Sequence, residues 1–100
     1  MEFLVLARPR GQAFAFDDPY GTYQAVKDYL DRGLESGWIA SARSLIDGGA
    51  VLVVKASSAE ELWDQLHSNP VFPAFEYEIE PLVQLDHTFR WVFEELSQQS

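Results

Sequence analysis

Three glutamates at alternate positions, Glu76, Glu78 and Glu80, form the most reactive pattern in this chain. In a β-strand, alternate side chains leave the same face, so the three carboxylates would form a row with neighbours about 6.5 to 7 Å apart. In a closed pocket, mutual repulsion and loss of solvent would favour the protonated form of at least one of them. Such a carboxyl group can carry a proton to or from a carbon or hydroxyl site. The alternative is a solvent-facing row, or a row paired with Arg43 and Lys55 on neighbouring strands.

Two cations and one histidine are further candidates for chemistry. Arg43 and Lys55 could hold a carboxylate or phenolate inside a pocket, and arginine does so in bidentate fashion. His87 could act as a general base near neutral pH. Asp86 precedes it, but neighbouring residues on an extended chain point in opposite directions, so we expect Asp86 to cap a helix instead. His67 lies near a predicted helix end, where a cation complements the helix dipole.

Trp38, Phe72 and Phe75 are candidates to line a flat aromatic pocket, because they lie near predicted strand ends and beside a proline-bracketed loop. Trp63 and Tyr23 fall on apolar stripes at helical spacing, so we expect them in the core. The two histidines are twenty residues apart and the chain has no cysteine, so the sequence shows no zinc-binding pattern and we expect no metal. No glycine-rich phosphate loop is evident either.

The first half of the chain reads as strand, loop, helix. Residues 2–8 are mostly apolar and predict a strand, and a loop covers residues 9–18. A helix then begins, because Asp17 or Asp18 can cap it and Pro19 suits its first position. Gly37 ends this helix. Its apolar stripe is expected at Tyr23, Val26, Leu30 and Leu34.

The second half begins with a hairpin. Residues 38–46 and 50–54 read as strands joined by Asp47-Gly48-Gly49, which supplies the backbone angles of a tight turn. The continuous apolar run at 50–54 favours a central strand. A capping box beginning at Ser57 or Ser58 opens a helix that stops at Asn69-Pro70. Its buried stripe is expected at Ala59, Leu62, Trp63 and Leu66.

The last strand is expected at residues 75–85, with Pro81 at a sheet edge or bulge because proline lacks an N–H donor. Residues 87–97 then form an amphipathic helix, with the apolar residues Phe89, Val92, Phe93 and Leu96 at helical spacing. This helix either packs on its own sheet or attaches to a partner subunit.

The resulting order is β-α-β-β-α-β with a terminal helix, which predicts an α+β, ferredoxin-like fold. Right-handed crossovers put both helices on one face of a four-stranded antiparallel sheet. The other face would be bare, and an exposed apolar face must be covered. We expect a second copy to cover it, so that two sheets close into a dimeric α+β barrel around a pocket.

Composition narrows the partners. One hundred residues predict a single domain, 1–100, in which residues 86–97 form a C-terminal helical extension. Sixteen acids against seven scattered Lys and Arg give a net charge of −9, which disfavours nucleic acid and anionic membrane surfaces as partners. No apolar run approaches the roughly 20 residues that span a bilayer. The absence of cysteine and of a basic N-terminal leader fits a cytoplasmic protein.

Residues 33–85 resemble the muconolactone isomerase-like group of the dimeric α+β barrel superfamily. The resemblance lies in Pro70-Val71-Phe72-Pro73 followed by the alternating strand from Glu76 to Leu82, together with the helix end at 34–38, the hairpin and the segment 59–62. It implies a small-molecule site in the barrel interior and a proton shift that moves a double bond in an unsaturated lactone, without metal or organic cofactor. Asn69 stands where related YCII-like proteins have an aspartate, so no catalytic residue is carried over from any family.

Three functions follow as hypotheses. The first is a homodimer, or higher homo-oligomer, that binds a small apolar or aromatic molecule and acts as a cofactor-free isomerase or cyclase, with Glu78 as the base. The second is a binding or accessory protein without catalysis. The third is a cofactor-independent monooxygenase, which would need an electron-rich aromatic substrate.

Overall fold

The structure, a computed structural model, describes residues 1–10 and 17–99. The predicted loop at 9–18 therefore lies largely outside the described residues. The elements follow the expected order, with a short 3-10 turn, η2, before the last strand. Their bounds are β1 (Glu2–Pro9), α1 (Pro19–Ser36), β2 (Ile39–Ser44), β3 (Ala50–Lys55), α2 (Ala59–His67), η2 (Phe72–Ala74), β4 (Phe75–Leu82) and α3 (Leu85–Gln99).

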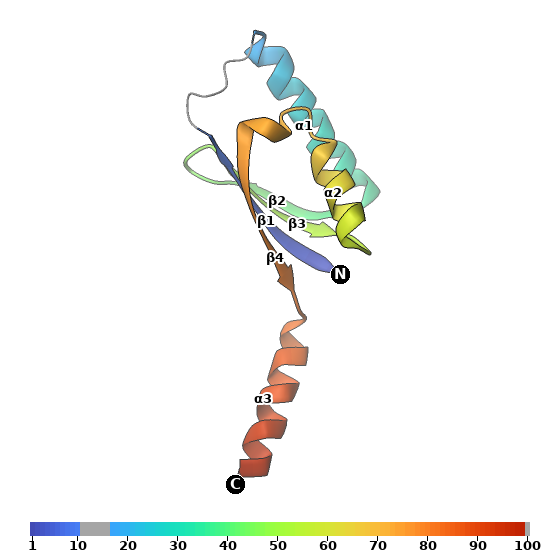
Figure 1. Ribbon diagram of the computed structural model, residues 1–100, viewed down its shortest axis with the longest axis vertical. Helices are drawn as coiled ribbons and strands as arrows, with labels where there is room; N and C mark the ends of the chain where they lie inside the picture. The colour runs from blue at the N-terminus through green and yellow to red at the C-terminus, as the bar shows by residue number, and fades with distance from the viewer. Residues whose placement is uncertain (11–16, 100) are drawn as a thin grey trace.

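The four strands form one antiparallel sheet in the order β2-β3-β1-β4 (Figure 1). β3 is therefore internal, as its unbroken apolar run predicts. β4 is an edge strand, which explains how Pro81 is tolerated within it. The ferredoxin-like α+β fold expected from the sequence is confirmed. β2 and β4 are shorter than expected. β2 spans Ile39–Ser44 instead of 38–46, and β4 ends at Leu82 instead of at residue 85.

Local signals start and stop the helices as predicted. The Gly21 N–H donates to Asp18 Oδ1 at 3.1 Å, so Asp18 is the cap of α1, and Gly37 ends α1 with a positive φ of 88°. Ser58 caps α2 by accepting from the Glu61 N–H at 3.1 Å. The Glu61 carboxylate in turn accepts from the hydroxyl of Ser57 at 2.9 Å and from its N–H at 3.3 Å, so the return contact reaches the residue before the cap and not the Ser58 N–H of the expected capping box.

α1 and α2 cover one face of the sheet, and the core lies between them and the strands (Figure 1). Val5, at the centre, is fully buried and pairs with Leu52 and Ile79 across its two neighbouring strands. Burying a side chain of this size stabilises the fold by about 1.5–3 kcal/mol. The core cluster comprises Phe3, Val5, Leu52, Val54, Ala56, Leu62 and Leu66.

The sheet buries fewer residues of α1 and α2 than the apolar spacing of these helices predicts. Tyr23 is 60% exposed and Trp63 is 63% exposed, so the prediction that these two rings belong to the core is wrong. Ala59 and Leu34 are also exposed. α1 buries only Tyr29 and Gly33, and α2 only Leu62 and Leu66, because each helix meets the sheet along a single line.

α3 runs away from the sheet, continuing beyond the end of β4 (Figure 1). It does not pack on its own sheet, and its Phe89, Trp91 and Phe93 are about half exposed or more. Asp86 lies inside the first turn, since α3 begins at Leu85, so the expected capping role of Asp86 is wrong. Across the described ranges, no helix combines the length and the apolar character needed to cross a membrane.

Candidate functional site

The acidic row lies on the face of the sheet that α1 and α2 leave uncovered. Residues paired directly across antiparallel strands share a face. Glu78 pairs with Leu6 and Glu80 with Leu4, whereas the next residue of β4, Ile79, pairs with the buried Val5. The alternation expected for the three glutamates is therefore confirmed. All three are exposed, and none forms an ion pair within the part of the chain that the structure describes.

The centre of this uncovered face is apolar. Leu4 and Leu6 of β1 pair with Val53 and Val51 of β3, and all four side chains are half-buried. We call this set the open-face strip. It lies between the acidic row on one edge strand, β4, and the other edge strand, β2, which carries Arg43 on this face.

One cation close to the acidic row is already engaged. The register sets Arg8 opposite Glu76, but the Arg8 guanidinium pairs with the Asp47 carboxylate at 3.0 Å. Asp47 lies in the turn between β2 and β3. Arg8 is thus drawn toward the hairpin and leaves the carboxylate of Glu76 without this neighbour.

Arg43 and Lys55 share the uncovered face with the glutamates but lie on other strands. Arg43 pairs with Val51, which pairs with Leu6, which pairs with Glu78. Three strand spacings, about 14 Å, therefore separate Arg43 from Glu78 within one chain. Lys55 of β3 pairs with Glu2 of β1, so β1 lies between Lys55 and β4. Among the described residues, neither cation forms an ion pair with a glutamate of the acidic row. Pairing with Arg43 or Lys55 of the same chain therefore does not account for the row.

Phe72 belongs to a stack of rings on the opposite, helix-covered side. The centre of its ring lies 4.7 Å from the ring centre of Tyr77 and 3.8 Å from that of His67. The ring centres of His67 and Trp63, which stack, are 3.7 Å apart. The four rings border an apolar groove of about 230 Å³ between α2 and β4. The spacing of Trp63 and His67, four residues apart on a helix, was the available signal for this stack.

Burial favours the neutral form of two tyrosine hydroxyl groups, those of Tyr77 in this ring stack and of Tyr29. Burial raises the pKa of Tyr77 to about 12, against a weaker opposing effect of a hydrogen bond with Asn69. Burial also raises the pKa of Tyr29, whose hydroxyl donates to the Gln65 carbonyl at 2.8 Å and ties α1 to α2. Trp38 packs on Tyr29 with ring centres 5.6 Å apart. Trp38 and Phe72 both pack against the core cluster.

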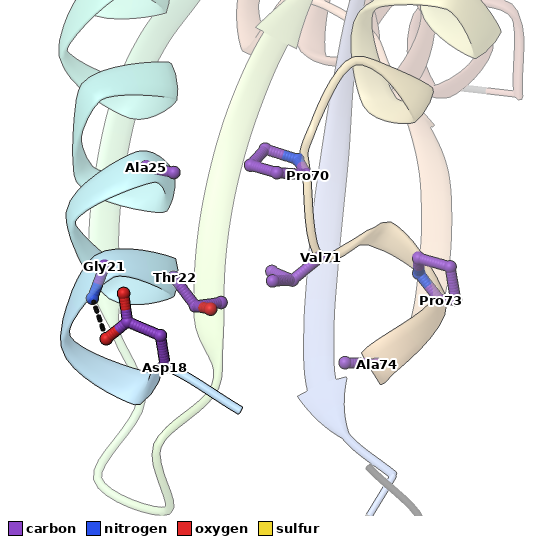
Figure 2. Close-up of a pocket in the computed structure, with 8 residues that line it drawn as sticks. All are labelled: Asp18, Gly21, Thr22, Ala25, Pro70, Val71, Pro73 and Ala74. Atoms are coloured by element: carbon purple, nitrogen blue, oxygen red, sulfur yellow. Dashed lines mark hydrogen bonds between the residues drawn. The ribbon is translucent and has the colours of Figure 1, made fainter. Parts of the chain in front are cut away.

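A second hollow lies between the first turns of α1 and the proline loop (Figure 2). Its volume is about 520 Å³, and Pro70 and Val71 point across it toward α1. The Asp18 carboxylate at its rim accepts the Gly21 N–H, so it serves the helix start. The lining residues are Asp18, Gly21, Thr22, Ala25, Pro70, Val71, Pro73 and Ala74. Sequence reasoning did not propose this cleft, because its two walls are about fifty residues apart in the chain and only the fold brings them together.

The remaining candidates are scattered. Phe75 is half-buried at the start of β4, and neither of the two hollows includes it. His87 is exposed on the first turn of α3, beyond the end of β4, so one chain does not bring it to Glu78. Asn69 Oδ1 accepts the Val71 N–H at 3.0 Å and so shapes the proline loop. Within the ranges described, no three acidic or histidine side chains cluster as a metal site would require.

Solved structures of two enzymes share this fold. Muconolactone isomerase matches with a TM-score of 0.73 over 84% of this chain and 90% of that chain, at 21% sequence identity. The 5-chloro-2-hydroxyhydroquinone dehydrochlorinase of Burkholderia phenoliruptrix, solved with 2,5-dihydroxybenzoquinone, matches with a TM-score of 0.65 over 87% and 98%, at 19% identity. The expected resemblance to the muconolactone isomerase-like group is thereby confirmed for the fold. No protein-family model and no curated protein matches the sequence.

Proposed function

We propose that this protein is a homodimeric α+β barrel that binds a small, mostly apolar organic molecule between its two sheets. In this proposal Glu78 moves a proton on that molecule without a cofactor. The observation that carries the proposal is the uncovered sheet face, in which the open-face strip runs beside a row of unpaired carboxylates. A strip of leucine and valine facing water is unfavourable, and covering it is the main gain from association.

A second copy suits this face because it offers a matching sheet. Two sheets packed face to face lie about 10 Å apart, which leaves room for side chains or for a flat ligand where side chains are small. Glu76, Glu78 and Glu80 would border the enclosed space. There, a carboxylate beside a bound molecule is placed to accept a proton from it and to return the proton.

Glu78 is the assigned base because it is the middle member of the row and pairs with Leu6 of the open-face strip. Its carboxylate would take a proton from the carbon between a carbonyl and a C=C bond, breaking the C–H bond and leaving a dienolate. Returning the proton to the far carbon of the dienolate shifts the double bond next to the carbonyl, and all atoms and electrons balance without an oxidant. The two structural neighbours are named as an isomerase and a dehydrochlorinase, and both kinds of reaction can proceed through proton removal from carbon.

A binding protein without catalysis is the second candidate. Asn69 favours it, because its side chain serves the backbone of the proline loop and cannot act as a base. The exposed rings of α3 favour it as well, since an amphipathic helix of this kind can attach to a partner subunit.

Two measurements test the leading proposal. Light scattering at micromolar concentration is expected to show a dimer or a multiple of it. Turnover is then measured with muconolactone, related unsaturated lactones and chlorinated hydroxyquinols. Glu78→Gln is expected to reduce kcat at least a hundredfold, because general acid–base catalysis contributes about 10²–10⁴-fold. Glu60→Gln on the exposed side of α2 is the matched control.

A Glu78→Gln variant with unchanged stability and unchanged turnover would remove Glu78 from the mechanism. Ligand binding without turnover of any of these compounds would favour the binding protein. Oxygen consumption with phenolic compounds would instead indicate the oxygenase.

A further inference from the structure

We propose that the site is shared between subunits, with Arg43 of one copy lying against Glu78 of the other. The proposal rests on the homodimer above and specifies how its two sheets face each other. It makes each acidic row incomplete in a single chain and supplies its cation from the second copy.

One cross-strand row of the uncovered face carries opposite charges at its two ends. Reading from β2 to β4, the row is Arg43, Val51, Leu6 and Glu78. Two apolar residues thus separate one cation from one anion. The row therefore complements its own reverse: a second copy turned end for end would set a cation over an anion at both ends.

A two-fold axis can relate the two sheets in two simple ways. If the axis runs along the strands, β2 of one copy faces β4 of the other, Arg43 faces Glu78, and Val51 faces Leu6. If the axis runs across the strands, β4 faces β4, and the two acidic rows meet. Facing sheets are rotated by about 30°, which displaces a row end 7 Å from the axis by about 3.5 Å, within the reach of an arginine side chain.

Electrostatics selects the first arrangement. Carboxylates that face one another in a space shielded from water repel strongly, and a buried charge without a partner is costly. The two side chains are also available for a partner. Within the described part of the chain, Arg43 donates only to the Ala42 carbonyl beside it, at 2.7 Å, and Glu78 has no ion pair. Arg8, the cation set opposite the row in the same chain, is held by Asp47.

The pairing also indicates the class of ligand. A guanidinium group has five N–H donors, so Arg43 can contact Glu78 of the second copy and still bind a planar anionic oxygen pair. The floor beside it is Val51 and Leu6. The site therefore suits a compact organic anion, a carboxylate or a phenolate, whose apolar part lies on the open-face strip.

Charge reversal tests the pairing. Arg43→Glu and Glu78→Arg are expected to raise the dimer dissociation constant at least tenfold when each variant is studied alone, as measured by analytical ultracentrifugation. Mixing the two variants is expected to restore dimers, because every facing pair is then Glu with Arg. Glu60→Arg, on the outer side of α2, is the control for the change of charge and is expected to dimerise as the wild type does.

The contrary results are distinct. A Glu78→Arg dimer tighter than the wild type would show β4 facing β4, and a mixture that stays monomeric would exclude the pairing. If either variant fails to fold by circular dichroism, a double-mutant cycle with Arg43→Gln and Glu78→Gln measures the same coupling, and additive effects would exclude the pairing. A monomeric wild type would overturn the homodimer and the proposed function with it, whereas a wild-type dimer insensitive to these changes overturns only the pairing.

Benzoate serves as the probe for the ligand class. Arg43→Lys keeps the charge needed for association but loses the planar fork, so the dimer is expected to persist while benzoate binding weakens about tenfold by calorimetry. Equal benzoate affinity in the two proteins, or no benzoate binding to the wild type, would remove Arg43 from ligand recognition.

Discussion

The Arg8 guanidinium binds the Asp47 carboxylate at 3.0 Å, although the strand register sets Arg8 opposite Glu76. This contact joins β1 to the turn between β2 and β3. The same carboxylate also accepts the Gly49 N–H at 3.1 Å, so Asp47 supports the hairpin as well as the ion pair. One aspartate thus shapes the turn and keeps a cation away from the acidic row.

Replacing Asp47 separates these two roles. Asp47→Asn keeps an acceptor for the Gly49 N–H but loses the ion pair, and both partners are about half exposed. We expect a loss of less than about 1 kcal/mol in the free energy of unfolding. Asp47→Ala loses both contacts and is expected to cost about 1 kcal/mol more. Urea unfolding measures both values, and equal costs for the two variants would contradict the role in the turn.

Gly33 gives a sharper prediction about packing. A Cβ added at Gly33 would overlap Ile39 Cδ1, and Ile39 is almost fully buried at the point where α1 packs on β2. Alanine is the better helix former by about 1 kcal/mol, but overpacking a rigid core typically costs about 1–3 kcal/mol. We expect Gly33→Ala to be destabilising in thermal and urea unfolding.

Ile39→Val provides the internal control for Gly33, because it removes the nearest atom, Cδ1. The double variant Gly33→Ala with Ile39→Val is expected to be more stable than the sum of the two single effects implies. Additive effects would show that the remaining close contacts, with Ile39 Cγ1 at 2.7 Å and Trp38 Cζ2 at 2.9 Å, set the cost of the added methyl group.

The buried tyrosines predict a loss of stability at alkaline pH. Burial raises the pKa of Tyr77 to about 12 and raises that of Tyr29, whereas an unfolded tyrosine titrates near 10.0. Between these values the native state holds more protons than the unfolded state, so the free energy of unfolding falls as pH rises above about 10. Below pH 10 the contribution is fully present. Urea midpoints from pH 8 to 11.5 measure it, and Tyr77→Phe is expected to flatten the decline.

Tyr20→Phe is the matched control for this pH dependence, since Tyr20 is 82% exposed. It is expected to leave the alkaline decline unchanged. A decline of equal slope in the Tyr77→Phe and wild-type proteins would assign the effect to other groups.

The terminal helix α3 contributes little to the packed body, because its side chains lie away from the core. Deleting residues 87–100 is therefore expected to leave the melting temperature of the sheet and its two covering helices nearly unchanged. Size-exclusion chromatography of the same variant tests whether α3 attaches to a partner subunit. If α3 attaches to a partner subunit, the deletion is expected to reduce the number of subunits in the assembly, and an unchanged number would reject that attachment.

Local patterns were enough to predict much of this molecule. The alternation of Glu76, Glu78 and Glu80, the cap at Asp18 and the positive φ at Gly37 each depend on a few neighbouring residues. A strand has a side-chain repeat of two, so one apolar partner row suffices to assign its faces. Order of elements and fold class followed from the same signals.

Relations between distant residues needed the tertiary structure. Helical spacing marks an apolar stripe but does not say how much of it the sheet covers, which is why Trp63 and Tyr23 were misassigned. The sequence places Arg43 and Glu78 each on a strand. Only the order and pairing of the strands in the folded sheet put them at opposite ends of one cross-strand row. Strand order results from pairing between segments far apart in the chain, which no short-range pattern contains. The sequence therefore identified the residues that can do chemistry, whereas the tertiary structure determined which residues lie next to them.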